Sequence, residues 1–135
     1  MKTGFKFVAI LMILGLALIA MPAGKVSAGL ADLYVSKTGL DTNDCLGTAT
    51  ACLTIQHAIS VASAGQTIYV DAGKYVENVI VDKAVTLTGA GAATTSIVAT
   101  DGNQDSLRFT GSGATVDGFT ITHEYTPAEL AAWTF

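Results

Sequence analysis

Short apolar runs separated by polar or glycine-containing turns make up most of this chain. They are densest between Gln66 and Gly91, where three β-branched runs predict short strands: Thr67–Val70, Val79–Val81 and Val85–Leu87. Turns at Asp71–Gly73 and Asp82–Ala84 separate these runs. Several runs are apolar at nearly every position, which is typical of strands covered on more than one side. The pattern therefore favours a coiled, stacked sheet of short strands.

The same rhythm continues on both sides of this segment. Leu33–Ser36 is predicted as an opening strand, and four more runs follow Gly91: Ser96–Val98, Leu107–Phe109, Ala114–Val116 and Phe119–Ile121. Polar or glycine turns divide the later part of the chain at Asp101–Asp105, Gly111–Gly113 and Asp117–Gly118. The 22 residues from Val85 to Leu107 predict one coil of three short strands.

One segment, Thr54–Ala64, has helical rather than strand periodicity. Its apolar residues fall at helical spacing and form one stripe: Ile55, Ala58, Ile59 and Ala62. Thr54 is expected as the N-cap and Gly65 as the glycine after the helix C-terminus. Polar residues occupy the opposite face: Gln56, His57, Ser60 and Ser63. His57 is therefore expected to be a solvated helix residue rather than a catalytic one.

The N-terminus has the pattern of a secretory signal peptide. Lys2 and Lys6 precede Phe7–Ala20, a run of 14 residues without charge, and small residues follow at Val26–Ala28. An uncleaved membrane anchor is the alternative, but the run is shorter than the roughly 20 residues that span a bilayer. We expect export with cleavage between Ala28 and Gly29.

The charge of the chain argues against one class of partner. Removal of residues 1–28 takes away three lysines and no acid, which changes the net charge from −4 to −7. An acidic surface repels phosphate backbones, so nucleic acid is not an expected partner. Membrane contact is expected only through the signal segment.

The two cysteines, Cys45 and Cys52, lie close together after the export signal. In an oxidising compartment such a pair is expected to form a structural disulfide that closes a small loop. Zinc is the alternative, but two thiols with His57 as the nearby histidine do not supply four ligands. The polar loop before them holds Asp41, Asn43 and Asp44, for which Asx turns are a better interpretation than a calcium site.

Four consecutive stretches carry a family resemblance: LYVSKTGLDTNDC, ACLTIQHAI, AGQTIYVDAGKYVENVIV and VTLTGAG. Their order is similar to that at the start of exported right-handed parallel β-helix, or pectin-lyase-like, proteins, and the resemblance covers about Leu33–Thr122. The third stretch matches the family pattern G-x-T-I-x-V-x-x-G-x-Y-x-E. The matching residues are Gly65, Thr67, Ile68, Val70, Gly73, Tyr75 and Glu77.

The resemblance implies an all-β fold, a right-handed parallel β-helix (solenoid) fragment with one N-terminal capping helix. We expect a signal peptide at 1–28, a cap of strand, disulfide loop and helix at 29–65, and two to three coils at 66–122. The cap would cover the exposed first edge of the stack. Gly73 and Gly89 are expected to turn the chain at positive φ. Tyr75 and Glu77 are expected to be structural, an aromatic at a corner and a carboxylate that accepts turn amides.

Residues 123–135 change character and predict a short helical stub. Thr126-Pro127-Ala128-Glu129 is a helix-start pattern, and three apolar residues follow at Leu130, Trp133 and Phe135. Two to three coils fall short of the three or more repeats that a stable array usually needs. Either the stub is a small C-terminal cap or the chain is the front of a longer solenoid, and we expect the second.

Enzymatic relatives of this fold use clustered carboxylates, often with calcium, and a nearby Arg or Lys. The residues of these types are Asp101, Asp105, Asp117, Arg108 and Lys83. Turn composition explains the acids, and Arg108 is expected to point outward from a strand. No catalytic motif matches, so no catalytic, cofactor-binding or metal-binding residue is assigned.

These observations favour an exported surface or secreted module with a structural, adhesive or carbohydrate-binding role. Its strand faces would present Thr, Ser and Asp side chains to carbohydrate or to other surface proteins. The alternative is the N-terminal part of a polysaccharide lyase or glycoside hydrolase whose active site lies in downstream coils. A small secreted β-sandwich is a third interpretation, although it leaves the cap pattern without a role.

Overall fold

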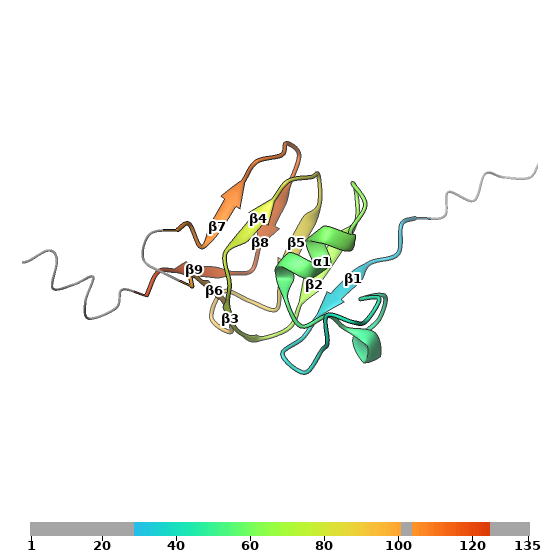
Figure 1. Ribbon diagram of the computed structural model, residues 1–135, viewed down its shortest axis with the longest axis horizontal. Coiled ribbons are helices and arrows are strands. Elements are labelled where there is room, and N and C mark those ends of the chain that lie inside the picture. Colours follow the sequence, from blue (N-terminus) through green and yellow to red (C-terminus); the bar gives the residue numbers. More distant parts are fainter. Residues whose placement is uncertain (1–28, 101–103, 125–135) are drawn as a thin grey trace, which may run out of the picture.

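The computed structural model describes residues 29–100 and 104–124 of the chain (Figure 1). Three sequence-based expectations lie outside these ranges. They are the signal segment with Ala28 of its cleavage site, the carboxylate of Asp101, and the helix start at Thr126.

The described residues form nine short strands, and every pairing between these strands is parallel (Figure 1). Their bounds are β1 (Leu33–Val35), β2 (Thr67–Val70), β3 (Gly73–Val76), β4 (Val79–Val81), β5 (Thr86–Gly89), β6 (Thr95–Val98), β7 (Leu107–Phe109), β8 (Thr115–Asp117) and β9 (Thr120–Thr122). A 3₁₀ helix, η1 (Thr48–Thr50), and an α-helix, α1 (Ile55–Val61), lie between β1 and β2. The expected all-β class with one short α-helix is confirmed for the described residues.

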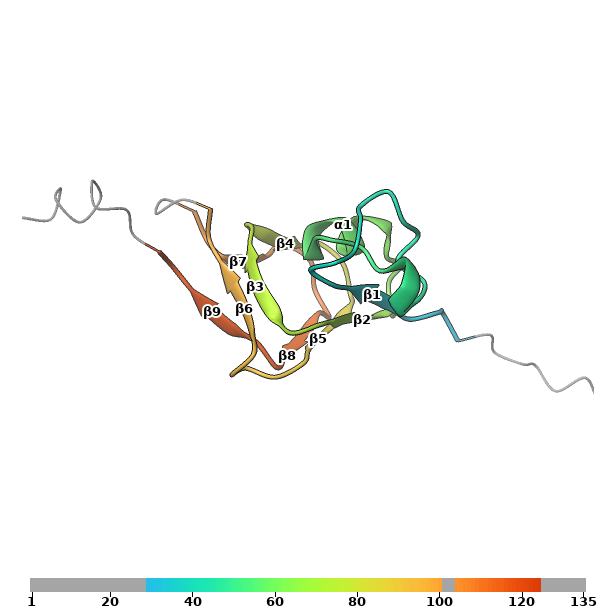
Figure 2. The same ribbon diagram turned by 90° about the horizontal axis from the view of Figure 1, so that it is seen from below.

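Successive strands join three sheets in rotation. β2, β3 and β4 lie in three different sheets, and β5, β6 and β7 return to those sheets in the same order. The resulting strand orders are β1-β2-β5-β8, β3-β6-β9 and β4-β7. Figure 2 shows these sheets as separate walls around a common interior. This rotation of short parallel strands in stacked layers is compatible with a solenoid-like fold.

The core consists of inward-pointing side chains that stack in register from one layer to the next. Ile68 lies opposite Leu87, and Tyr75 lies opposite Ile97. These four side chains are at most 1% exposed. Burial of each such side chain stabilises the fold by about 1.5–3 kcal/mol. The apolar runs of the sequence therefore form the interior of the stack.

Helix α1 covers the first end of this core. Thr54 is the N-cap, as predicted, and its hydroxyl accepts a hydrogen bond from the backbone N–H of His57 at 3.2 Å. The predicted stripe is buried, with Ile55, Ala58 and Ile59 all fully inaccessible to solvent. The helix contacts β1, β2 and β4. It therefore closes the end of the stack nearest β1.

Polar groups of the cap also pair with the first strand edges. The carbonyl of Tyr34 in β1 accepts from the Cys52 N–H at 2.9 Å, and the Ser36 N–H donates back to the Cys52 carbonyl at 2.9 Å. At β4 the partner is a side chain, the amide of Gln56. Its oxygen accepts from the Ile80 N–H at 2.7 Å, and its nitrogen donates to the Ile80 carbonyl at 3.4 Å. Gln56 thus takes the place of a neighbouring strand.

The predicted helix end was wrong. The helix ends at Val61 rather than Ala64, and Ala62 is the C-cap. Gly65 lies beyond this cap, so it is not the glycine of the helix C-terminus. It has φ +91° in the turn that leads to β2, where its N–H donates to the carbonyl of Ala84 at 2.6 Å. Glycine is favoured there by the positive φ.

The turn assignments of Gly73 and Gly89 were also wrong. Gly73 begins β3, a strand that the sequence pattern did not predict, and Gly89 ends β5. Neither has a positive φ. Both lie where other groups approach closely: a Cβ at Gly73 would lie 2.6 Å from Cγ of Lys37, and one at Gly89 would lie 2.3 Å from the carbonyl oxygen of Gly118. Close packing, not backbone freedom, explains these two glycines.

The predicted coil length was wrong as well. Val85 directly precedes β5, whereas Leu107 begins β7, which pairs with β4 rather than with β5. Leu107 lies opposite Val79, and Thr86 of β5 lies opposite Thr115 of β8. The layers differ in length because the turns between strands differ in length, so a single interval does not describe the repeat.

Candidate functional site

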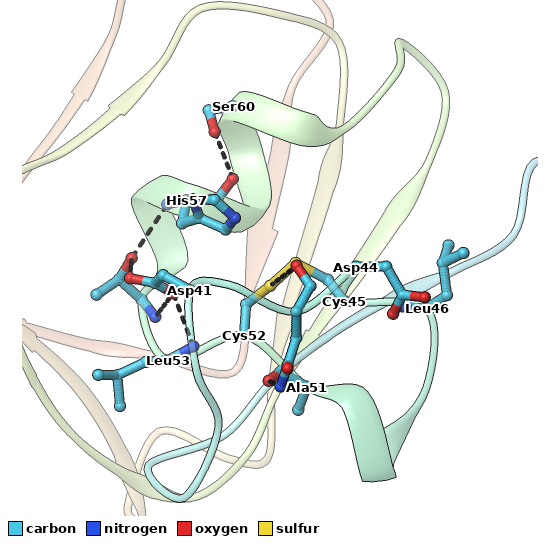
Figure 3. Close-up of a disulfide and its surroundings, with 11 residues drawn as sticks. Asp41, Asp44, Cys45, Leu46, Ala51, Cys52, Leu53, His57 and Ser60 are labelled. Carbon is cyan, nitrogen blue, oxygen red and sulfur yellow. Dashed lines mark hydrogen bonds between the residues drawn. A yellow bond between two sulfur atoms is a disulfide. The ribbon is translucent and has the colours of Figure 1, made fainter.

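The disulfide between Cys45 and Cys52 is present, as the sequence predicted (Figure 3). The two residues are separated by 7 positions and their Cα atoms lie 5.0 Å apart. Both are fully buried beneath α1. Nitrogen of His57 lies within 4.8 Å of both sulfurs, so this histidine packs against the disulfide and is partly buried rather than fully solvated. The bonded sulfurs are not thiolates, which argues against the zinc alternative.

The acidic loop before the disulfide is held by long-range hydrogen bonds as well as by a local turn. One oxygen of Asp41 accepts from the backbone N–H groups of Leu53 and Thr54 at 2.8 and 2.9 Å, and the other accepts from the Thr54 hydroxyl at 2.8 Å. The Asx-turn interpretation is therefore wrong for Asp41. It holds for Asp44, whose carboxylate accepts from the Leu46 N–H at 3.0 Å.

The ionisation of Asp41 reflects these contacts. Burial raises the pKa of its carboxyl, but the hydrogen bonds from Thr54 and Leu53 and the nearby His57 outweigh burial. The pKa therefore lies below the ordinary value of 3.8. Because this carboxylate is occupied by protein donors on both oxygens, it positions the N-terminus of α1 rather than presenting a calcium ligand.

Glu77 and Tyr75, the last residues of the family-like motif, are structural. The Glu77 carboxylate accepts from the backbone N–H groups of Ile55 at 3.0 Å and Gln56 at 2.9 Å. These are amides of the first turn of α1, not the turn amides that the sequence predicted. Burial raises the pKa of Glu77 more than these hydrogen bonds lower it. The motif thus joins the helix to the strands.

Tyr75 fills the corner between the sheets. Its side chain is 1% exposed, and its hydroxyl donates to the Asp71 carbonyl at 3.0 Å. Burial, followed by the charges of Asp71 and Glu77, raises its pKa to about 12. The ammonium of Lys37 lies 5.0 Å from the ring centroid, within the range of a cation–π contact.

The candidate catalytic residues are not brought together. Lys83 donates to the carbonyls of Ser60 and Ala62 at the C-terminal end of α1. Asp117 lies on β8, in a different sheet from Arg108 on β7. Arg108 is exposed, as predicted, and lines a polar hollow of about 300 Å³ with Asn78, Ile80, Gln104 and Asp105. Among the described residues, Arg108 therefore lies in the same hollow as Asp105, whereas Lys83 and Asp117 lie in other parts of the fold.

A second surface has a more regular chemistry. The outer side of the β1-β2-β5-β8 sheet, here called the threonine face, consists of Tyr34, Thr67, Tyr69, Thr86, Thr88, Thr115 and Asp117. Thr67, Thr86 and Thr115 form one row in register across three strands. The second row follows the order Tyr34, Tyr69, Thr88 and Asp117.

The threonine face is available to a ligand. The rings of Tyr34 and Tyr69 stack with centroids 5.6 Å apart, and Tyr69 is 40% exposed. No hydrogen bond joins the hydroxyls of the Thr67, Thr86 and Thr115 row to another residue in the described part of the chain. Adjacent strands lie about 4.8 Å apart, so these hydroxyls repeat at about that interval. The sequence predicted strand faces that present Thr, Ser and Asp. The alignment of these side chains into rows depends on the strand register, which the sequence pattern did not predict.

Comparison with protein-family models, with curated proteins and with solved structures finds no match. Within residues 29–100 and 104–124, no helix has both the length and the apolar character needed to cross a bilayer. The disulfide is a bond that persists in oxidising compartments such as the extracellular space.

Proposed function

We propose that this chain is an exported right-handed parallel β-helix module of the pectin-lyase-like type, and that its threonine face binds carbohydrate at a cell surface or in a secretion. The rotation of strands through three parallel sheets, with a helix and a disulfide loop over the first edges, supports the fold assignment. The observation that carries the binding role is the row of Thr67, Thr86 and Thr115 hydroxyls beside Tyr69.

The chemistry of this face suits a sugar chain. Sugars present hydroxyl groups around a ring with apolar C–H faces. A threonine hydroxyl can donate and accept hydrogen bonds, and the Asp117 carboxylate can accept hydrogen bonds from two sugar hydroxyl groups. Tyrosine adds an apolar ring with a polar tip. Because the face carries Asp117 and no basic residue, and because the chain is acidic overall, we propose a neutral rather than an acidic polysaccharide as its ligand.

Export is proposed from the N-terminal segment and from the disulfide. The basic start and short apolar run favour a cleaved signal, and cleavage leaves an acidic mature chain. N-terminal sequencing of the protein recovered outside an expressing cell is expected to begin at Gly29. Recovery of an extracellular chain that begins at Met1 would contradict cleavage.

Binding is expected to be visible by affinity gel electrophoresis in gels that contain hydroxyethyl cellulose, a neutral mannan or polygalacturonate. The neutral gels should retard the protein and the polygalacturonate gel should not. Thr86→Val keeps the branched side-chain shape and removes one hydroxyl. The loss of one hydrogen bond of about 1 kcal/mol should weaken binding roughly fivefold.

The matched control is Thr42→Val, which removes an exposed hydroxyl in the polar loop before Cys45 that is not part of the threonine face. This variant should migrate like the wild type in every gel. Tyr69→Ala should reduce retardation further, with a thermal melt to show that it is folded. Equal retardation of the wild type and Thr86→Val would locate binding elsewhere, and no retardation in any gel would remove the carbohydrate role.

A further inference from the structure

The Tyr69 ring on the threonine face has an aromatic neighbour on one of its two sides. Tyr34 lies opposite it on β1 and stacks on it, with the ring centroids 5.6 Å apart and the ring planes inclined by 26°. The second face of the Tyr69 ring is therefore directed along the stack toward β5, where Thr88 lies opposite Tyr69. Tyr69 is 40% exposed even though Tyr34 covers its first face. An aromatic face thus borders the space above Thr88.

The residues that follow Tyr69 along its row are short or acidic. Thr88 is half-buried, and Asp117 comes next in register on β8 and is exposed. Within the described residues, no hydrogen bond engages the Thr88 hydroxyl or the Asp117 carboxylate. Adjacent strands lie about 4.8 Å apart, so the Tyr69 ring and the Asp117 carboxylate are about two strand spacings apart, with Thr88 between them. We call the set of Tyr69, Thr88 and Asp117 the Tyr69 subsite.

We propose that the Tyr69 subsite binds one pyranose ring of a neutral sugar, oriented across the row rather than flat along it. The proposal rests on the carbohydrate role proposed above for the threonine face. Carbon atoms in contact lie about 3.5–4.0 Å apart. A sugar whose apolar face packs on the second face of Tyr69 is therefore displaced by nearly one strand spacing, which places it over Thr88.

The polar groups around this position match the hydroxyls at the edge of a sugar ring. Thr88 lies beneath the ring and can both donate and accept hydrogen bonds. The Asp117 carboxylate lies one strand further and can accept hydrogen bonds from two hydroxyls. Thr86 is two residues before Thr88 on β5 and points to the same side of the sheet, about 7 Å away. It can therefore contact the same ring from its other end.

The orientation of the ring decides where the rest of a polysaccharide lies. Equatorial glycosidic bonds leave a pyranose roughly in the plane of its ring. Because this plane follows the plane of the Tyr69 ring, neighbouring sugar units extend along the strands or away from the sheet, and not along the rows. Strand β5 has 4 residues, so the face is only about 13 Å wide in that direction. Affinity should therefore come mainly from one sugar unit and depend little on chain length.

Competition in the affinity gels tests this orientation. The full chain is run with methyl β-glucoside, cellobiose or cellotetraose against hydroxyethyl cellulose, and with the corresponding β-mannose series against the mannan. The tetrasaccharide should compete at most about fivefold better than the monosaccharide, since it carries four rings instead of one. A larger ratio would show that the sugar chain follows the rows and would overturn the proposal. Absence of retardation in every neutral gel is a different result, which would remove the carbohydrate role and the subsite with it.

Variants of the Tyr69 subsite test its residues. Asp117→Asn keeps the side-chain shape and one acceptor oxygen, and it should weaken retardation roughly tenfold; Thr88→Val should weaken it roughly fivefold. Tyr69→Phe keeps the ring face and should be retarded nearly as strongly as the wild type. Asp82→Asn is the matched control, because it makes the same charge change at an exposed position after β4, in another sheet, and it should migrate like the wild type.

One outcome would reject the subsite and keep the carbohydrate role. Full retardation of both Asp117→Asn and Thr88→Val, together with weakened retardation of Thr86→Val, would place the sugar on the Thr67, Thr86 and Thr115 row instead.

Discussion

The double variant Cys45→Ala/Cys52→Ala is expected to lose about 2–3 kcal/mol of unfolding free energy, the amount that closure of a short loop contributes. The bond spans 7 positions, and both residues are buried under α1. The loop that it closes also supplies the Cys52 backbone groups that pair with β1. Urea titrations of the oxidised wild type and the variant, followed by circular dichroism, would measure the difference.

The redox state provides the control for this experiment. Reduction of the wild type should lower its urea midpoint toward that of the variant, whereas the variant should not respond to reductant. If the wild type has the same midpoint with and without reductant, the disulfide does not stabilise the cap.

Glu77→Ala is expected to lower the unfolding free energy by about 2–4 kcal/mol, because it leaves two helix amides without a partner. Those amides belong to Ile55 and Gln56, at the start of the helix that covers the core. Glu77→Gln keeps one acceptor oxygen and should lose about half as much. Asp82→Ala is the matched control, since Asp82 is exposed and its side chain makes no hydrogen bond within the described residues. A Glu77→Ala variant as stable as the wild type would show that water replaces the carboxylate at no cost.

The Glu77 carboxylate should also make the free energy of unfolding depend on pH. Burial raises its folded pKa above the ordinary value of 4.5, so the folded state binds the proton more tightly than the unfolded state does. Its contribution is therefore fully present below pH 4.5 and declines as the pH rises through the folded pKa. Asp41 acts in the opposite direction: its pKa is lowered, so its contribution is present above pH 3.8 and is lost as the pH falls through its folded pKa. The difference in unfolding free energy between the wild type and Glu77→Gln, measured across pH 4–7, isolates the first effect. An increase in this difference with pH would contradict it.

The strands that could be predicted are those whose side chains are mostly apolar. The predicted bounds of β2, β4 and β7 agree with the structure, and β1 ends one residue early. Strand β3 was missed because Gly73 and Lys74 suggest a turn, while only Tyr75 points inward. Its position is decided by pairing with β6, which is a tertiary contact that no local pattern records.

The site chemistry was predictable in composition but not in arrangement. The disulfide followed from two nearby cysteines in a chain whose N-terminus has an export-signal pattern. The partners of Glu77 lie 21 and 22 residues away in the sequence, and those of Asp41 lie 12 and 13 away, so local rules suggested turns for both. The rows of the threonine face depend on strand register, and the turns that set this register vary in length.

The amide of Gln56 on the Ile80 backbone has a consequence for assembly. Together with the Cys52 loop on β1, it occupies two of the three strand edges at the start of the stack, those of β1 and β4. Within the described residues the opposite end is uncovered, since Phe109 is 51% exposed and Ile121 is 50% exposed, so that end is the one favoured for association with another molecule. Two copies could meet only through that same surface, an isologous contact that closes on itself and leaves nothing for a third. Exposure of the last layer would thus produce pairs, whereas a stack with two unoccupied ends could extend into fibres.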